Sequence, residues 1–183
     1  MGELAGLWFL TDPVRSPDPV AVAKRLPAGA VVVFRAFGAA DAMAVGVALR
    51  RVTLARRQTL LIGADPMLAK ALRADGVHLP ERLWRLAPRL RHAHPRWIVT
   101  AAAHGRAAAH TAARQFDAVL VSAIFASSSP SAGRPIGAVR LARLARQAKA
   151  PVVALGGIKG RTAARAAGGG IYGLAAIEAL VRT

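Results

Sequence analysis

Pro151-Val152-Val153-Ala154-Leu155-Gly156-Gly157-Ile158 carries the clearest fold signal in the chain. The four apolar residues from Val152 to Leu155 form a short run typical of a fully buried strand, and two glycines follow it directly. Similar short runs alternate with Ala-, Leu- and Arg-rich segments of helical character along the whole sequence. This alternation predicts parallel strands connected by helices.

Eight strand and helix pairs are expected in this pattern. The strands are expected near Leu7 to Leu10, Ala30 to Phe34, Thr59 to Ile62, Gly76 to Leu79, Trp97 to Ala101, Ala118 to Ser122, Val152 to Leu155 and Ile171 to Leu174. The helices are expected near Pro19 to Arg25, Ala42 to Leu54, Pro66 to Arg73, Leu83 to Arg91, Gly105 to Arg114, Ala138 to Gln147, Thr162 to Ala167 and Ile177 to Val181.

The number of units favours an α/β fold of the compact (β/α)8 barrel type, a TIM barrel with parallel strands. A doubly wound open sheet more often has about five or six strands, and no G-x-G-x-x-G follows the first strand. Because such barrels usually have about 200 to 250 residues, a chain of 183 residues requires short helices and loops. An incomplete barrel is the alternative.

Length and composition indicate one domain spanning residues 1–183, with 54% hydrophobic residues to form its core. Charged residues or prolines interrupt every apolar stretch well before the ~18 residues that a membrane span needs. Glu3 stands where a secretory signal carries basic residues, which predicts a cytoplasmic location. The absence of cysteine excludes disulfides, thiolate metal sites and cysteine nucleophiles.

The net charge of +17 will attract polyanions. The arginines are scattered along the sequence, and aromatic residues, which stack on bases, make up only 5% of it. These features favour a solvated basic surface over a nucleic-acid site. A polyanion-binding protein stays open as a third functional class beside the two given below.

Candidate functional residues are those that follow strands, because a parallel barrel gathers its reactive groups at the carboxyl ends of the strands. Gly156 and Gly157 follow the seventh strand, and Gly173 belongs to the glycine-rich segment of the eighth. Backbone amides at the ends of the seventh and eighth strands are therefore predicted to bind a phosphate group together, as a phosphate cradle. Ser127 and Ser129, after the sixth strand, add hydroxyl donors.

Acids and histidines are sorted by the same rule. Asp65 and Glu81 follow adjacent strands and are a candidate pair for a displaced Mg²⁺ ion. Asp75 and Asp117 precede strands and are expected to be turn residues on the opposite, stabilising face. Of the five histidines, only His104 is a catalytic candidate; the others do not form a metal site.

Four ordered blocks resemble the thiamine phosphate synthases and their TenI-type relatives. Leu7-Trp8-Phe9-Leu10-Thr11-Asp12 is similar to the family's L-Y-L-I-T-D, and Ala74-Asp75-Gly76-Val77-His78-Leu79 to A-D-G-V-H-L. Ile124-Phe125-Ala126-Ser127-Ser128-Ser129 resembles P-I-F-x-T-x-T, and the segment from Pro151 to Ile158 resembles P-V-V-A-I-G-G-I. The resemblance extends over almost the whole chain.

The resemblance implies a transferase of thiamine biosynthesis that joins a hydroxymethylpyrimidine diphosphate to a thiazole phosphate, with Mg²⁺ assisting the departure of diphosphate. It assigns a phosphate-directed cation to Arg35 and an S-x-H histidine to His104. Several functional side chains that it implies are replaced. The replacing residues are Val33, Phe37, Gly63, Ala64, Leu83, Ala102, Ala123 and Pro130.

Two functions follow from this comparison. The first is a thiamine phosphate synthase or TenI-like protein, whose partners are a phosphorylated thiazole or pyrimidine or thiamine phosphate. The second is a non-catalytic, regulatory relative that binds a phosphorylated ligand after losing the metal and diphosphate side chains. Neither function requires a membrane, and both allow a homo-oligomer.

Overall fold

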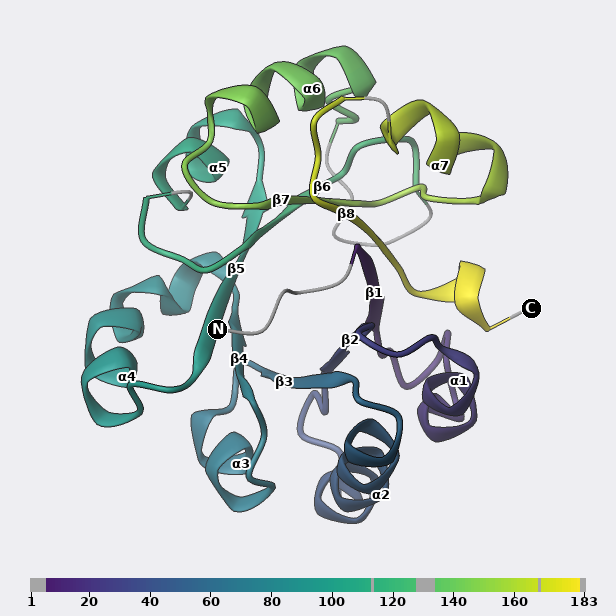
Figure 1. Ribbon diagram of the computed structural model, residues 1–183, viewed down its shortest axis with the longest axis vertical. Helices are drawn as coiled ribbons and strands as arrows, with labels where there is room; N and C mark the ends of the chain where they lie inside the picture. Colours follow the sequence, from purple (N-terminus) through teal and green to yellow (C-terminus); the bar gives the residue numbers. More distant parts are fainter. Residues whose placement is uncertain (1–5, 113, 128–133, 168, 182–183) are drawn as a thin grey trace.

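The computed structural model describes residues 6–112, 114–127, 134–167 and 169–181. Eight strands form a central ring, and the helices lie around its outside (Figure 1). Every neighbouring pair of strands is parallel, and the ring closes where β8 pairs with β1. The compact (β/α)8 barrel expected from the sequence is confirmed, and the incomplete barrel is excluded.

The strands are short, and most helices span only two or three turns. The strands are β1 (Leu7–Leu10), β2 (Val31–Phe34), β3 (Thr59–Gly63), β4 (Gly76–Leu79), β5 (Ile98–His104), β6 (Val119–Ser122), β7 (Val152–Leu155) and β8 (Gly173–Ala176). The helices are α1 (Pro19–Arg25), α2 (Ala42–Ala55), α3 (Pro66–Ala71), α4 (Ala87–Ala93), α5 (Arg106–Ala112), α6 (Ala138–Gln147) and α7 (Gly160–Ala167), with 3₁₀ turns η1 (Glu81–Leu86) and η2 (Glu178–Leu180).

Alternation along each strand divides the apolar residues between two layers. Val31 and Val33 of β2 belong to a cluster inside the ring, whereas Val32 and Phe34 pack outward against the helices. Trp8 is fully buried in the inner cluster and fills the ring near its amino end. The ring is therefore solid at this end, and only the opposite end can hold a ligand.

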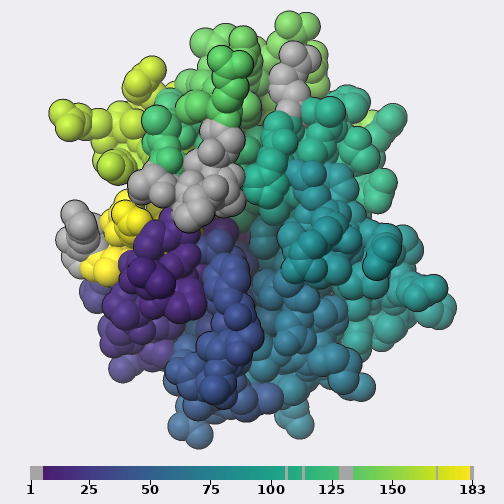
Figure 2. Space-filling model, turned by 180° about the vertical axis from the view of Figure 1, so that it is seen from behind, coloured from purple at the N-terminus to yellow at the C-terminus, as the bar shows by residue number. Residues whose placement is uncertain are grey.

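The segment around α1 and the segment after β8 meet on the face seen in Figure 2, where purple and yellow lie side by side. Arg25 of α1 donates hydrogen bonds to the carbonyl oxygens of Leu180 and Val181, at 3.4 and 3.2 Å. After β8 the described chain forms the three-residue turn η2 in place of the helix expected from Ile177 to Val181.

Two strands differ from their expected positions. β5 continues to His104, so that this residue ends the strand instead of following it. β8 begins at Gly173, two residues later than expected. The reason lies at Gly173 itself, where a Cβ would overlap the backbone of Gly6, so the chain can enter the ring only at a residue without a side chain.

Asp75 and Asp117 lie at the amino ends of β4 and β6, on the stabilising face, as predicted. Asp75 accepts hydrogen bonds from the Leu60 amide at 2.8 Å and from Arg50 at 2.9 Å. Asp117 accepts from the Val99 amide at 2.7 Å. Each carboxylate thus ties its own strand to the preceding one.

No helix in the described parts of the chain is long and apolar enough to cross a bilayer.

Replacing Asp75 by Ala is expected to lower the free energy of unfolding by about 2 kcal/mol, because the Leu60 amide and Arg50 would lose their acceptor. Urea unfolding measures this loss. Asp41→Ala is the control, since Asp41 is exposed and its side chain makes no capping hydrogen bond. Equal stability of the two variants would contradict a structural role for Asp75.

Candidate functional site

A cavity of about 880 Å³ opens at the carboxyl ends of the strands. Residues from the end of every strand or from the loop after it contribute to its wall. Among them are Arg15, Arg35, Asp65, His78, Arg82, His104, Ser127, Gly156, Gly157, Lys159 and Glu178. The volume is sufficient for a small phosphorylated ligand.

Gly156 and Gly157 line this cavity directly after β7, as the sequence predicted. Both have positive φ angles, +94° and +66°, and a Cβ at Gly157 would lie 2.8 Å from the Cβ of Phe125. The hydroxyl of Thr162 in α7 donates to the Gly157 carbonyl at 2.7 Å and fixes the turn. Only glycine suits both positions, which keeps the backbone accessible from the cavity.

The other predicted phosphate residues have different outcomes. Ser127 lines the cavity. Ser129 lies outside the described residues. Gly173 begins β8 at the closed end of the barrel and does not belong to the described cavity wall. Its phosphate-binding role stays a prediction, and in the structure Gly173 makes a close approach to Gly6.

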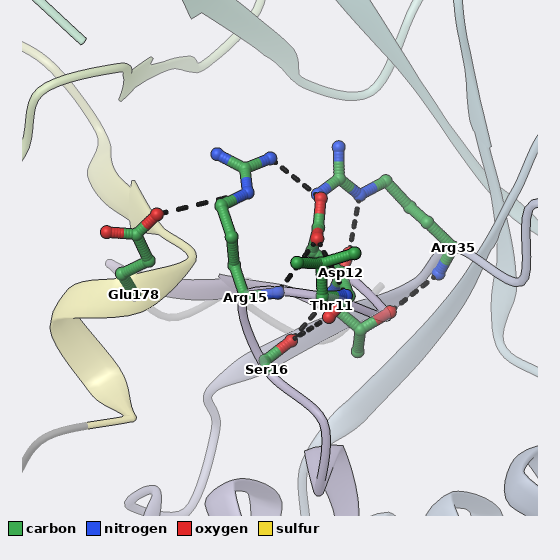
Figure 3. A network of polar contacts seen from close by, with 7 residues as sticks. Thr11, Asp12, Arg15, Ser16, Arg35 and Glu178 are labelled. Carbon is green, nitrogen blue, oxygen red and sulfur yellow. Dashed lines mark hydrogen bonds and ion pairs between the residues drawn. The ribbon is translucent and has the colours of Figure 1, made fainter. Parts of the chain in front are cut away.

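Arg35 lies at the end of β2 and is held in place by residues that follow β1. Its Nε donates to the Thr11 carbonyl at 2.7 Å, its amide donates to the Thr11 hydroxyl at 2.9 Å, and its Nη2 lies 3.5 Å from Asp12 Oδ2 (Figure 3). Gly63 leaves room for this conformation, since a Cβ there would be 2.9 Å from Arg35 Cγ. The guanidinium thus has a fixed position in the cavity wall.

Asp12 also binds Arg15, which lines the cavity after β1. Arg15 Nη2 lies 2.7 Å from Asp12 Oδ2, and the amides of Val14 and Arg15 donate to Asp12 Oδ1 (Figure 3). Burial alone would raise the pKa of Asp12, but the hydrogen bonds from Arg15 and Val14 outweigh it and lower this pKa. Asp12 is therefore an anion shared by two arginines.

Burial lowers the pKa of Arg35 to about 10; Asp12 opposes this shift, and Arg15 adds to it. At neutral pH the Arg35 guanidinium still carries its full charge. Its Nη2 is buried without a hydrogen-bond acceptor among the residues that the structure describes. Arg35 thus brings a full positive charge to the cavity wall, with Nη2 buried on the side of Asp12.

His104 lies at the rim of the cavity, at the end of β5, with Glu81 beside it. Glu81 Oε1 accepts from the His104 amide at 2.6 Å and lies 3.1 Å from His104 Nδ1. Glu81 does not belong to the described cavity wall. The structure thus brings Glu81 to the catalytic candidate His104, which the sequence did not predict.

Asp65 lines the cavity but begins α3, and its Oδ1 accepts from the Leu68 amide at 2.9 Å. The contacts of Asp65 and Glu81 serve a helix start and a histidine. Within the described ranges, no group of three or more His, Cys, Asp or Glu residues could hold a metal ion. These residues do not fit the Mg²⁺ site considered from the sequence.

The profile of the thiamine monophosphate synthase family matches residues 8–180. The chain belongs to this family. A protein of Aquifex aeolicus is 34% identical over 131 residues, which cover 71% of this chain and 70% of that protein. A relative from Roseiflexus sp. named thiamine-phosphate synthase is 34% identical over 153 residues. These residues cover 78% of this chain and 61% of the Roseiflexus protein.

A thiamine phosphate pyrophosphorylase from Pyrococcus furiosus has the same fold, with a TM-score of 0.82 and 25% identity. The superposition covers 97% of this chain and 88% of that chain. The regions matched in the Aquifex and Roseiflexus relatives span 70% and 61% of those proteins' own lengths. The resemblance inferred from the sequence is thus confirmed at the level of family and fold.

Most positions where the family's functional side chains are replaced lie in the cavity wall. Phe37, Gly63, Ala64, Ala102 and Ala123 all line it. Val33 lies deeper, fully buried in the inner cluster, Leu83 packs against the core from η1, and Pro130 is outside the described residues. The replacements that the resemblance implies therefore affect the cavity itself. Most of them place a small apolar side chain, or none, in the cavity wall.

Three cations in the cavity wall were missed by reasoning from the sequence. Arg15 follows β1, Arg82 follows β4, and Lys159 follows β7 two residues after Gly157. Their position after strands was the signal, but the rule was applied to glycines, serines, acids and histidines and not to these cations. In the described part of the chain, neither Arg82 nor Lys159 forms an ion pair with a carboxylate.

His78 forms part of the cavity floor and is buried, with Nδ1 2.9 Å from the Thr100 hydroxyl. Burial, assisted by the charges of Arg35 and His104, lowers the pKa of His78 to about 3. His78 is therefore a neutral hydrogen-bonding group at every physiological pH. It is packed inside the barrel and also faces the site.

Acidification is expected to destabilise the protein through His78. In the unfolded chain a histidine gains a proton as the pH falls through about 6.5, whereas folded His78 stays neutral down to a pH of about 3. The free energy of unfolding should therefore fall below pH 6.5, and the His78 contribution should approach ~1.4 kcal/mol per pH unit. Urea unfolding at several pH values measures the slope.

His78→Gln should reduce this slope by close to the contribution of one proton, ~1.4 kcal/mol per pH unit. His92→Gln, at an exposed position, should leave the slope unchanged. An unchanged slope in the His78 variant would show that His78 does not cause the pH dependence.

Proposed function

We propose that this protein is a thiamine phosphate synthase-like transferase that joins hydroxymethylpyrimidine diphosphate to thiazole phosphate. The observation that carries the proposal is the joint position of Gly156, Gly157 and Arg35 in one cavity of about 880 Å³. The names of the relatives from Roseiflexus and Pyrococcus support the same activity. A cytoplasmic location and a homo-oligomer stay predictions.

The reaction requires positive charge where the leaving diphosphate develops negative charge. The carbon–oxygen bond of the pyrimidine methylene group breaks, its electron pair leaves with the diphosphate, and the carbocation-like centre bonds to the thiazole. Arg35, Arg82 and Lys159 are the cavity cations that would stabilise the leaving group. We infer that Arg82 and Lys159 compensate for the family cations replaced at Phe37 and Pro130.

The backbone amides near Gly156 and Gly157 would hold the thiazole phosphate at the β7 loop, with the Ser127 hydroxyl as a further donor. His104, positioned by Glu81, would contact the reacting rings from the rim at β5. Because Asp65 and Glu81 do not fit a metal site, no step of this mechanism depends on a protein-bound Mg²⁺ ion.

Thiamine phosphate formation from the two substrates tests the proposal. Arg35→Ala is expected to lower kcat/KM by about 100-fold or more, and Lys159→Ala by about 10- to 100-fold, since each removes a charge that stabilises the transition state. Lys149→Ala is the matched control because Lys149 is exposed, does not line the described cavity, and precedes the amino end of β7, opposite the end at which the cavity opens. Product analysis by chromatography measures the rates.

Absence of product, together with retained binding of thiamine phosphate, would contradict the transferase and favour the non-catalytic, phosphate-binding relative. Loss of activity in the Lys149 variant to the same extent as in the Lys159 variant would instead indicate a general effect of surface charge.

Calorimetric titration with Mg²⁺ tests the metal site considered from the sequence. The protein alone is expected to give no binding heat, because Asp65 and Glu81 are engaged with Leu68 and His104. A site that binds Mg²⁺ in the wild type and is lost in both Asp65→Asn and Glu81→Gln would contradict this expectation. Titration in the presence of diphosphate distinguishes a metal carried by the substrate from one held by the protein.

A further inference from the structure

Glu178 places a carboxylate at the end of the cavity where the phosphate is expected to bind. It follows β8, the strand that pairs with β7, and both Glu178 and the turn of Gly156 and Gly157 line the cavity. Among the described lining residues, only Asp65 and Glu178 are acidic. An anion-binding end of a barrel would be expected to carry neutral or basic residues.

The charge of Glu178 is only weakly compensated. Its Oε1 lies 4.0 Å from Arg15 Nε, whereas the Nη2 of the same arginine lies 2.7 Å from Asp12 (Figure 3). The Glu178 side chain is 46% exposed. Arg15 is thus paired more closely with Asp12 than with Glu178, and the described residues place no cation nearer to the Glu178 carboxylate than Arg15.

We propose that Glu178 sets the charge selectivity of this end of the cavity. Its carboxylate repels a dianionic phosphate held at the β7 loop, and it can accept a hydrogen bond from an uncharged hydroxyl group in the same place. Glu178 therefore narrows the preference for a phosphorylated thiazole over the corresponding thiazole alcohol. The inference rests on the proposed function and extends it to the substrate class.

Isothermal titration calorimetry at low ionic strength tests this role with three probes: inorganic phosphate, hydroxyethylthiazole phosphate and hydroxyethylthiazole. Glu178→Gln keeps the shape of the side chain and removes its charge. It is expected to tighten binding of both phosphate probes at least fivefold and to leave the alcohol unchanged or weaker. The gain should shrink at high salt, because salt screens charges at an exposed site.

Asp41→Asn is the matched control. It removes one negative charge from an exposed position that does not line the described cavity, so it should leave all three affinities unchanged. Glu178→Ser is a second substitution at the site, and it should reproduce the gain if charge is the cause.

The proposal is overturned if Glu178→Gln leaves phosphate affinity within twofold of the wild type or weakens it, or if Asp41→Asn produces the same gain. A lack of phosphate binding in every variant would overturn both this proposal and the phosphate cradle at Gly156 and Gly157. Tighter phosphate binding without any thiamine phosphate formation would support the role of Glu178 and contradict the transferase.

Discussion

Pairing between β8 and β1 is the constraint on which the whole site depends. It closes the ring, so that all eight strands direct their carboxyl ends to one opening. In an open sheet, Arg15 after β1 and Glu178 after β8 would lie at opposite edges, whereas here they are 4.0 Å apart. Closure itself depends on the contact between Gly6 and Gly173, two residues without side chains at the amino end of the barrel.

The division of large and small side chains along the barrel axis creates the cavity. Trp8 and Leu120 fill the amino end, while Gly63, Ala102 and Ala123 leave the carboxyl end open. The sequence resemblance implies functional side chains at these three positions, and residues with a small side chain or none leave more space there. Backbone donors at Gly156 and Gly157 are unaffected by such replacements, because no side chain provides them.

The sequence was sufficient to predict six of the strands closely, because each is a short, buried apolar run bounded by a helical segment. β8 was displaced by two residues because Ile171 and Tyr172 are apolar and continue the pattern, while the contact between Gly173 and Gly6 is visible only in three dimensions. The pairing of Glu81 with His104 was unpredictable for a related reason. It depends on how the loop after β4 turns across the end of β5.

The four cations of the described cavity wall, Arg15, Arg35, Arg82 and Lys159, differ in whether a carboxylate lies beside them. Stabilising a leaving diphosphate depends on where positive charge lies in the cavity and not on which strand provides it. Around β8 and β1, two arginines share Asp12, and Glu178 lies 4.0 Å from one of them. Arg82 and Lys159, after β4 and β7, have no such counter-ion in the described structure. Positive charge without a carboxylate partner in the described cavity wall is therefore concentrated after β4 and β7, where the proposed reaction would use it to stabilise the leaving diphosphate.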